Sequence, residues 1–115
     1  MFIAMNRFKV ALGREREFEE MWLKRESHLP KLAGFVSFHL LRGPTRDDHT
    51  LFSSHTTWAS RRHFEDWTVS PEFEAAHRNA HRSAGFMVGP AEFEGFDVAM
   101  SLFAPGTGAA VAGEA

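Results

Sequence analysis

The side chains best suited to chemistry in this sequence gather in residues 64–84, which read FEDWTVSPEFEAAHRNAHRSA. Pro71 interrupts this stretch. Proline lacks a backbone N–H and disfavours the α region for the residue before it, so we expect one helix to end near Val69. A second helix should begin at Pro71, with Ser70 as its N-cap and two glutamates near its positive end. The stretch is therefore predicted to form two short helices joined at a hinge.

The second of these helices carries an imidazole, His77, that could bind a metal. One face of the helix holds residues at spacings of three and four, namely Phe73, Ala76, His77, Ala80 and Ala84. Neutral imidazole is a metal ligand, and the small methyl groups beside it would let a flat ring system lie against the helix. Two other interpretations stand. In the first, His77 is a hydrogen-bonded core residue. In the second, His77 and His81 bind a transition metal as a His-xxx-His pair, although no nearby acidic residue completes the zinc-protease arrangement.

Asn6 is a second candidate, and it lies in a predicted strand over residues 2–10. The alternation of FIAMNRFKV places on one face Phe2, Ala4, Asn6, Phe8 and Val10. We expect this face to be buried, and Asn6 is its only polar member. Burying an amide without partners is costly, so its side chain either bonds to a neighbouring backbone group or donates into a pocket.

The remaining elements are predicted from periodicity and turn residues. A stripe around Trp22 predicts a helix over residues 13–28. Residues 60–69 form the first helix of the hinged pair, where the simplest role for Trp67 is core packing. Alternating apolar and polar side chains predict strands over residues 35–42, 50–58 and 92–103.

These elements follow the order β-α-β-β-α(α)-β, which is typical of a ferredoxin-like α+β fold with a four-stranded antiparallel sheet and helices on one face. The other face would carry His39 and His55, whose sequence spacing gives no support for a metal role. A homodimer that pairs two sheets face to face would bury that face. We expect residues 1–103 to form this one domain and residues 104–115 to form a flexible C-terminal tail.

The composition narrows the function further. The chain has 115 residues, of which 43% are hydrophobic and 24% charged, as in ordinary globular proteins. A formal charge of −2 indicates no nucleic-acid partner, and no apolar run is long enough to cross a membrane. The absence of cysteine excludes thiol catalysis and fits a cytoplasmic location. Twelve Phe and three Trp with no Tyr favour a dry core or pocket.

Asn6, Trp67 and His77, in this order and spacing, resemble the IsdG-like haem-degrading monooxygenases. These belong to the antibiotic-biosynthesis-monooxygenase superfamily of dimeric α+β barrels. The segments that carry the likeness are AMNRF around Asn6, GF at Gly34-Phe35, TTWAS around Trp58, and FEDWTVSPEFEAAH. The likeness covers about residues 1–100. A Trp-x9-His element with an upstream strand Asn is its most specific part.

The resemblance implies a role for each of the three residues. His77 would be the axial ligand of the haem iron, and Asn6 would be a hydrogen-bond donor on the distal side. Trp67 would press on the macrocycle and force it out of plane. The other haem-binding residues of the second helix would be Phe73, Ala76, Arg78, Ala80 and His81. Candidates for pairing with the haem propionates are Arg25, Arg78, His81 and Arg82.

The activity implied is a haem oxygenase for which haem is both cofactor and substrate. O2 would be activated on the haem iron, an external electron donor would supply electrons, and ring opening would release iron. Three alternatives stand beside it: a cofactor-free monooxygenase acting on a phenol or quinol, a non-catalytic haem carrier or sensor, and a structural dimerisation module. His77 argues against the first, and Asn6 argues against the other two.

Overall fold

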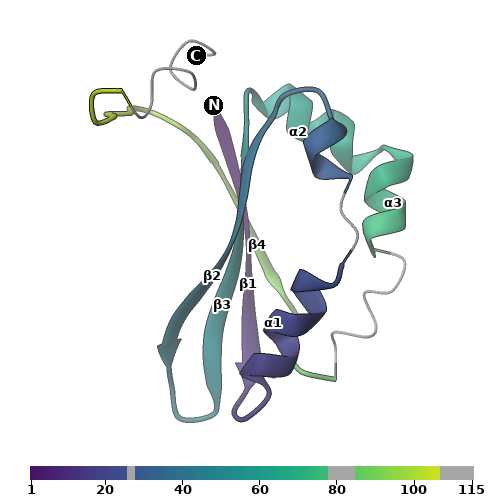
Figure 1. The fold of residues 1–115 in the computed structure, drawn as a ribbon, viewed down its shortest axis with the longest axis vertical. Coiled ribbons are helices and arrows are strands. Elements are labelled where there is room, and N and C mark those ends of the chain that lie inside the picture. Colours follow the sequence, from purple (N-terminus) through teal and green to yellow (C-terminus); the bar gives the residue numbers. More distant parts are fainter. Residues whose placement is uncertain (26–27, 78–84, 107–115) are drawn as a thin grey trace.

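The computed structural model describes residues 1–25, 28–77 and 85–106, which form an antiparallel sheet of four strands covered by helices (Figure 1). The elements are β1 (Phe2–Ala11), α1 (Glu15–Leu23), the 3-10 helix η1 (Leu29–Lys31), β2 (Phe35–Thr45), β3 (His49–Trp58), α2 (Arg61–Thr68), α3 (Pro71–His77) and β4 (Glu92–Asp97). The strand order in the sheet is β2-β3-β1-β4. The predicted ferredoxin-like α+β fold is confirmed.

The helices of the described residues lie on one face of the sheet, and the other face is bare (Figure 1). Helix α1 covers the end of the sheet near the β2–β3 turn, whereas α2 covers the opposite end and α3 lies beside α2, farther from the strands (Figure 1). In β1 the residues Phe2, Ala4 and Val10 are buried, as the period of two predicts. The face predicted to be buried is thus buried at these three residues and half-buried at Asn6 and Phe8.

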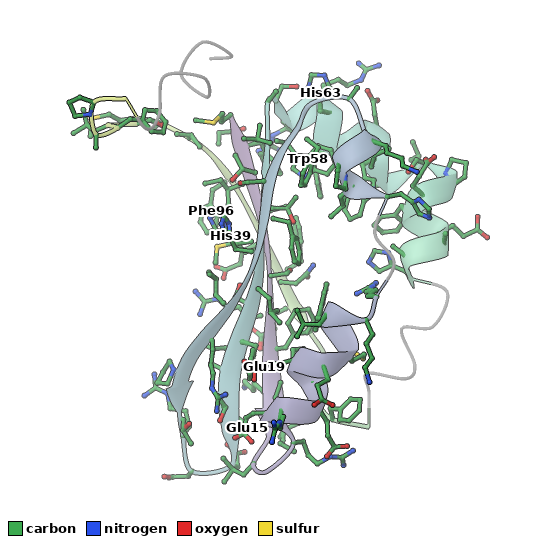
Figure 2. All side chains as sticks on the ribbon, in the orientation of Figure 1. Glu15, Glu19, His39, Trp58, His63 and Phe96 are labelled. Atoms are coloured by element: carbon green, nitrogen blue, oxygen red, sulfur yellow. The ribbon has the colours of Figure 1, made fainter. Side chains whose placement is uncertain are left out.

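The hydrophobic core is divided into two clusters, one under each group of helices. The cluster beneath α2 is made of the buried residues Phe2, Ala4 and Trp58, with Phe64 and Trp67 among those packed against it. The cluster beneath α1 is made of Val10, Phe18 and Phe52, with Phe8 and Trp22 among its neighbours. Trp58 is fully buried and points from β3 toward the helices (Figure 2). The central part of the sheet, around Asn6 of β1, lies between the two clusters.

The hinge between α2 and α3 has the predicted geometry. Helix α2 ends at Thr68 and α3 begins at Pro71. The Ser70 hydroxyl accepts a hydrogen bond from the backbone N–H of Phe73 at 3.1 Å and donates one to the carbonyl of Trp67 at 2.6 Å. One side chain thus caps the start of α3 and satisfies the end of α2.

Gly34, at the turn into β2, must be glycine for two reasons. Its φ of 80° lies in the left-handed region, and a Cβ built there would collide with the His63 ring of α2. The carbonyl of Gly34 also accepts from the backbone N–H of Ala59 at 2.7 Å. The turn is therefore pressed closely against the start of α2.

The helix predicted over residues 13–28 is shorter in the structure, because α1 ends at Leu23. The side chain of Leu23 is 85% exposed, so the last turn gains little from packing. The chain then tightens, with the N–H of Arg25 bonding to the carbonyl of Trp22. Residues 26 and 27 lie outside the described part.

The last strand is also shorter than the predicted 92–103, since β4 ends at Asp97. Asp97 is paired with Phe2, and the N–H of Val98 bonds to the carbonyl of Met1. The pairing of β4 with β1 ends there. The following residues therefore leave the sheet, and Leu102 is 87% exposed.

The β2–β3 hairpin is longer than the two predicted strands 35–42 and 50–58. Strand β2 continues to Thr45 and β3 begins at His49, with a register shift between Arg42 and Thr45. Pro44 sits in that irregularity on an edge strand, where its missing N–H costs no sheet hydrogen bond. Among the described residues, none of the helices has the length and apolar character needed to cross a membrane.

Candidate functional site

Asn6 occupies the middle of the helix-facing side of the sheet. It is paired with Ser54 of β3 on one side and with Phe93 of β4 on the other. Its neighbours on the same face of β1 are Ala4, which belongs to the cluster under α2, and Phe8, which packs on the cluster under α1. Asn6 is half-buried and lies between two hydrophobic clusters rather than inside either.

The Asn6 amide makes no hydrogen bond with any described residue. The interpretation that its side chain bonds to a neighbouring backbone group is therefore not supported there. An amide in an apolar setting gains from any partner that enters, because unpaired donors cost free energy. The geometry leaves both N–H groups available to a ligand on the helix side of the sheet.

His77 ends α3 and has one ring nitrogen committed. Its Nδ1 lies 2.8 Å from the carbonyl oxygen of Phe73, which can only accept, so Nδ1 carries the proton and donates. In the neutral ring Nε2 then keeps its lone pair and is free to bind a metal. The ring stacks on Phe73 with centroids 4.1 Å apart. His77 is exposed, so the expectation of an enclosed core histidine is not met in the described residues.

Trp67 joins His77 to the core through aromatic contacts. Its ring centroid lies 5.5 Å from that of Trp58, 4.8 Å from that of Phe73 and 6.0 Å from that of His77. The half-buried indole therefore packs on the cluster beneath α2, as the simplest interpretation held, and also contacts the imidazole. Both proposed roles for Trp67 are compatible with this position.

Arg25 connects α1 to α3. Its guanidinium lies over the Trp22 ring, with Cζ 4.5 Å from the ring centroid, and donates to the backbone carbonyl of Ala76. Burial lowers the pKa of Arg25 from its ordinary value, although the group stays cationic. The positive charge of Arg25 therefore lies at the carbonyl of Ala76, the residue before His77. Of the arginines considered for the propionates, Arg25 is the one within the described residues.

The remaining predicted site residues divide into two groups. Phe73 and Ala76 are half-buried on α3, next to His77. The predictions for Arg78, Ala80, His81, Arg82 and Ala84 lie outside the described residues. Within the described chain no group of three or more His, Cys, Asp or Glu side chains is arranged to hold a metal ion. A metal there would depend on fewer protein ligands.

Sequence reasoning missed Phe93 and Ser54, which flank Asn6 in the sheet. Phe93 stacks on Phe64 of α2 with centroids 5.6 Å apart and is 52% exposed, so it forms one wall beside the amide. The sequence shows that Phe93 is apolar, but it does not show the strand register that puts Phe93 beside Asn6.

A hollow of about 180 Å³ near α2 is lined by Leu32, Ala33, Trp58, His63, Asp66, Trp67 and Ser70. Neither Asn6 nor His77 lines it, so we do not assign the chemistry to this hollow.

A family model described as antibiotic biosynthesis monooxygenase matches residues 1–79. This chain belongs to that family. The match includes Asn6, Trp67 and His77 and covers more than half of the sequence. No curated protein matches this family member.

Several solved structures are similar to this chain over almost its whole length. A putative antibiotic biosynthesis monooxygenase from Bacillus cereus shares 19% identity and covers 90% of this chain and 95% of its own, with a TM-score of 0.74. The haem-degrader MhuD from Mycobacterium tuberculosis, solved with two haems bound in its active site, shares 28% identity over 90% of this chain and 100% of its own, with a TM-score of 0.68. SnoaB, a cofactor-independent oxygenase from Streptomyces nogalater, shares 25% identity over 88% and 95%, with a TM-score of 0.62. Structures similar to this chain therefore include one solved with haem bound and another described as cofactor-independent.

Proposed function

We propose that this antibiotic biosynthesis monooxygenase family member is a haem-degrading monooxygenase. It binds haem through His77 and opens the porphyrin ring with O2 and electrons from an external donor, releasing iron. The observation that carries the proposal is the tautomer of His77, because the bond from Nδ1 to the Phe73 carbonyl leaves Nε2 free and aims the ring. The 28% identity to MhuD supports the same conclusion.

The residues present fit a haem. An axial imidazole with a fixed orientation is the usual protein ligand of haem iron. The stacked rings of Phe73 and Trp67 offer an aromatic surface beside His77. Arg25, held by Trp22 and the Ala76 carbonyl, supplies a cation for a propionate at the edge of that surface. Arg78, Ala80 and His81 stay predicted contacts of the haem.

When bound, the haem supplies iron at which O2 can be reduced, and its own ring is the carbon skeleton that is oxidised. The chain's side chains orient this chemistry. Asn6 provides an amide, without a partner in the part of the chain that the structure describes, that can donate to the oxygen substrate in an apolar setting, where such a bond is stronger than in water. Trp67, backed by the buried Trp58, is a rigid wall that can press on the macrocycle. These roles for Asn6 and Trp67 are part of the proposal.

The assembly belongs to the proposal as well. The bare face of the sheet carries exposed apolar residues such as Leu41 and Phe96, which a second copy of the chain would cover. We propose a homodimer formed by that face, in the cytoplasm, where a reductase or small reductant supplies electrons. Residues 1–103 would form the domain and residues 104–115 a tail, of which residues 107–115 lie outside the described part.

A second candidate is a cofactor-free monooxygenase acting on a phenol or quinol. The similarity to SnoaB favours it. The exposure of His77 favours it too, because an axial ligand inside an enclosed haem site would be shielded from solvent. Asn6 and Trp67 fit both candidates. Only the use of His77 separates them, since a cofactor-free enzyme has no need of an iron ligand.

A hemin titration followed by addition of a reductant, with catalase present, tests the proposal. We expect a complex with a defined Soret band that decays in air after reduction, with iron captured by a chelator. A complex that persists under reductant and air would indicate a carrier or sensor. Absence of specific hemin binding would overturn the haem proposal and lead to tests with phenolic substrates.

A further inference from the structure

The bare face of the sheet carries two histidines side by side. His39 of β2 and His55 of β3 are directly paired across the two strands, and their ring centroids lie 6.2 Å apart. Figure 2 shows His39 on the side of the sheet away from the helices. The two histidines are sixteen positions apart in the sequence, so their meeting follows from the strand register and not from local spacing.

Both imidazoles have their nitrogens available. Among the described residues, neither ring makes a hydrogen bond or an ion pair. By contrast, the Nδ1 atoms of His49 and His63 bond to Asp48 and Ser60. An imidazole without a partner keeps a lone pair for a metal in its neutral form. Among the described residues, His39 and His55 therefore face each other across two strands with ring nitrogens that have no hydrogen-bond partner.

The distance suits a shared ion. Metal–nitrogen bonds to imidazole are about 2.0–2.1 Å, which holds two rings on one ion with their centroids about 5–6 Å apart. A small change in side-chain rotamer brings the observed rings into that range. Facing residues on neighbouring strands are also held rigidly by the ladder, so little ordering is needed on binding.

The third side chain in this row is a thioether. Met5 of β1 is paired with His55 on its other side, and it is half-buried on the same face. Beyond it lies Glu94, which is already paired with Arg7 at 2.5 Å. Two imidazoles next to a thioether are ligands of borderline and soft character, which copper accepts better than magnesium or calcium do.

We propose that His39 and His55 bind a divalent transition-metal ion on the bare face of the sheet, copper(II) more tightly than zinc or nickel. This site is separate from the proposed haem site, since the helices lie on the opposite face of the sheet from His39 (Figure 2). The same face is the one we propose to be covered by a second copy of the chain. The ion would then lie at that interface and would strengthen the dimer.

Calorimetric titration of copper(II) sulfate into the full-length, untagged chain without haem tests this proposal. We expect one tight site per chain, or one per two chains if the dimer brings both pairs to one ion. Each substitution removes one of the two imidazole ligands, so His39→Asn or His55→Asn should weaken binding about 10-fold or more. Saturating copper should raise the unfolding midpoint of the parent chain and not that of the double variant.

Two further variants keep the result specific. His49→Asn removes a histidine that is bonded to Asp48 and should leave copper affinity unchanged. His77→Ala should abolish hemin binding yet leave the copper site intact, whereas His39→Asn should weaken copper binding and leave hemin binding intact. No tight copper site in the parent chain would overturn the proposal. Equal affinity in the parent and in the His39→Asn/His55→Asn double variant would overturn it too, even if haem is degraded as proposed.

Discussion

The Asn6 amide lies between two apolar clusters and has no partner among the described residues, whereas a side chain placed there for stability alone would be apolar. We expect Asn6→Ala to leave the unfolding midpoint unchanged or to raise it, because a polar group without partners is removed. Haem binding should persist, while degradation should slow about 100- to 1,000-fold, as expected when a preorganised donor is lost. Thermal unfolding and single-turnover decay of the Soret band measure the two effects. Degradation at the parent rate would contradict the role of Asn6.

His77 is exposed, so its removal should cost the fold little. His77→Ala should abolish tight axial binding of hemin, since Nε2 is the free nitrogen of a ring aimed by the Phe73 carbonyl. The Soret band on titration is the measurement, and His49→Asn is the matched control. A hemin complex with the parent spectrum in His77→Ala would assign the axial ligand elsewhere.

At the scale of elements, the helix caps connect stability to the site. Ser70 caps α3, which carries His77, and Ser60 caps α2 by accepting from the N–H of His63 at 3.3 Å. Ser70→Ala and Ser60→Ala should each cost about 1 kcal/mol of unfolding free energy. Only Ser70→Ala should also weaken hemin binding, because Ser70 caps the helix that carries His77. Equal hemin affinity in the two variants would show that the cap does not position His77.

A second prediction at this scale concerns the contact between α1 and β3. The hydroxyl of the buried Thr50 donates to the Glu15 carboxylate at 2.7 Å, and this bond is the largest of the causes that hold the pKa of Glu15 below its ordinary value. A lowered pKa in the folded state stabilises the fold above the unfolded pKa, and that contribution is lost as pH falls. The unfolding midpoint of Glu15→Gln should therefore fall less than that of the parent chain between about pH 5 and pH 3. Parallel midpoint curves for the two proteins would contradict this.

At the scale of the whole molecule, the bare face decides the assembly. Phe96 of β4 is 47% exposed and points away from the helices (Figure 2). Phe96→Glu should convert the proposed dimer to a monomer, since a charge would be buried in an apolar interface. Val69→Glu makes the same change at an 84% exposed site at the end of α2 and should leave the assembly intact. Sedimentation velocity measures both, and a monomeric parent chain would contradict the dimer.

Several features of this protein are determined locally and can be read from its sequence. The hinge at Ser70 and Pro71 follows from a missing N–H and a hydroxyl three residues before the donor that it caps. The position of Asn6 on the helix-facing side follows from the period of two along a strand. Pairing of His77 with Phe73 follows from the i, i+4 spacing of a helix.

The tertiary structure decided what depends on distant partners. Strand β4 stops at Asp97, where its pairing with Phe2 of β1 ends, and nothing within residues 92–103 encodes that limit. Arg25 reaches the carbonyl of Ala76, 51 residues along the chain, and so places a cation beside the imidazole. The pairing of His39 with His55 and the gap between the two clusters around Asn6 arise from strand register and helix packing. Such contacts are set by which surfaces meet, so no local pattern determines them.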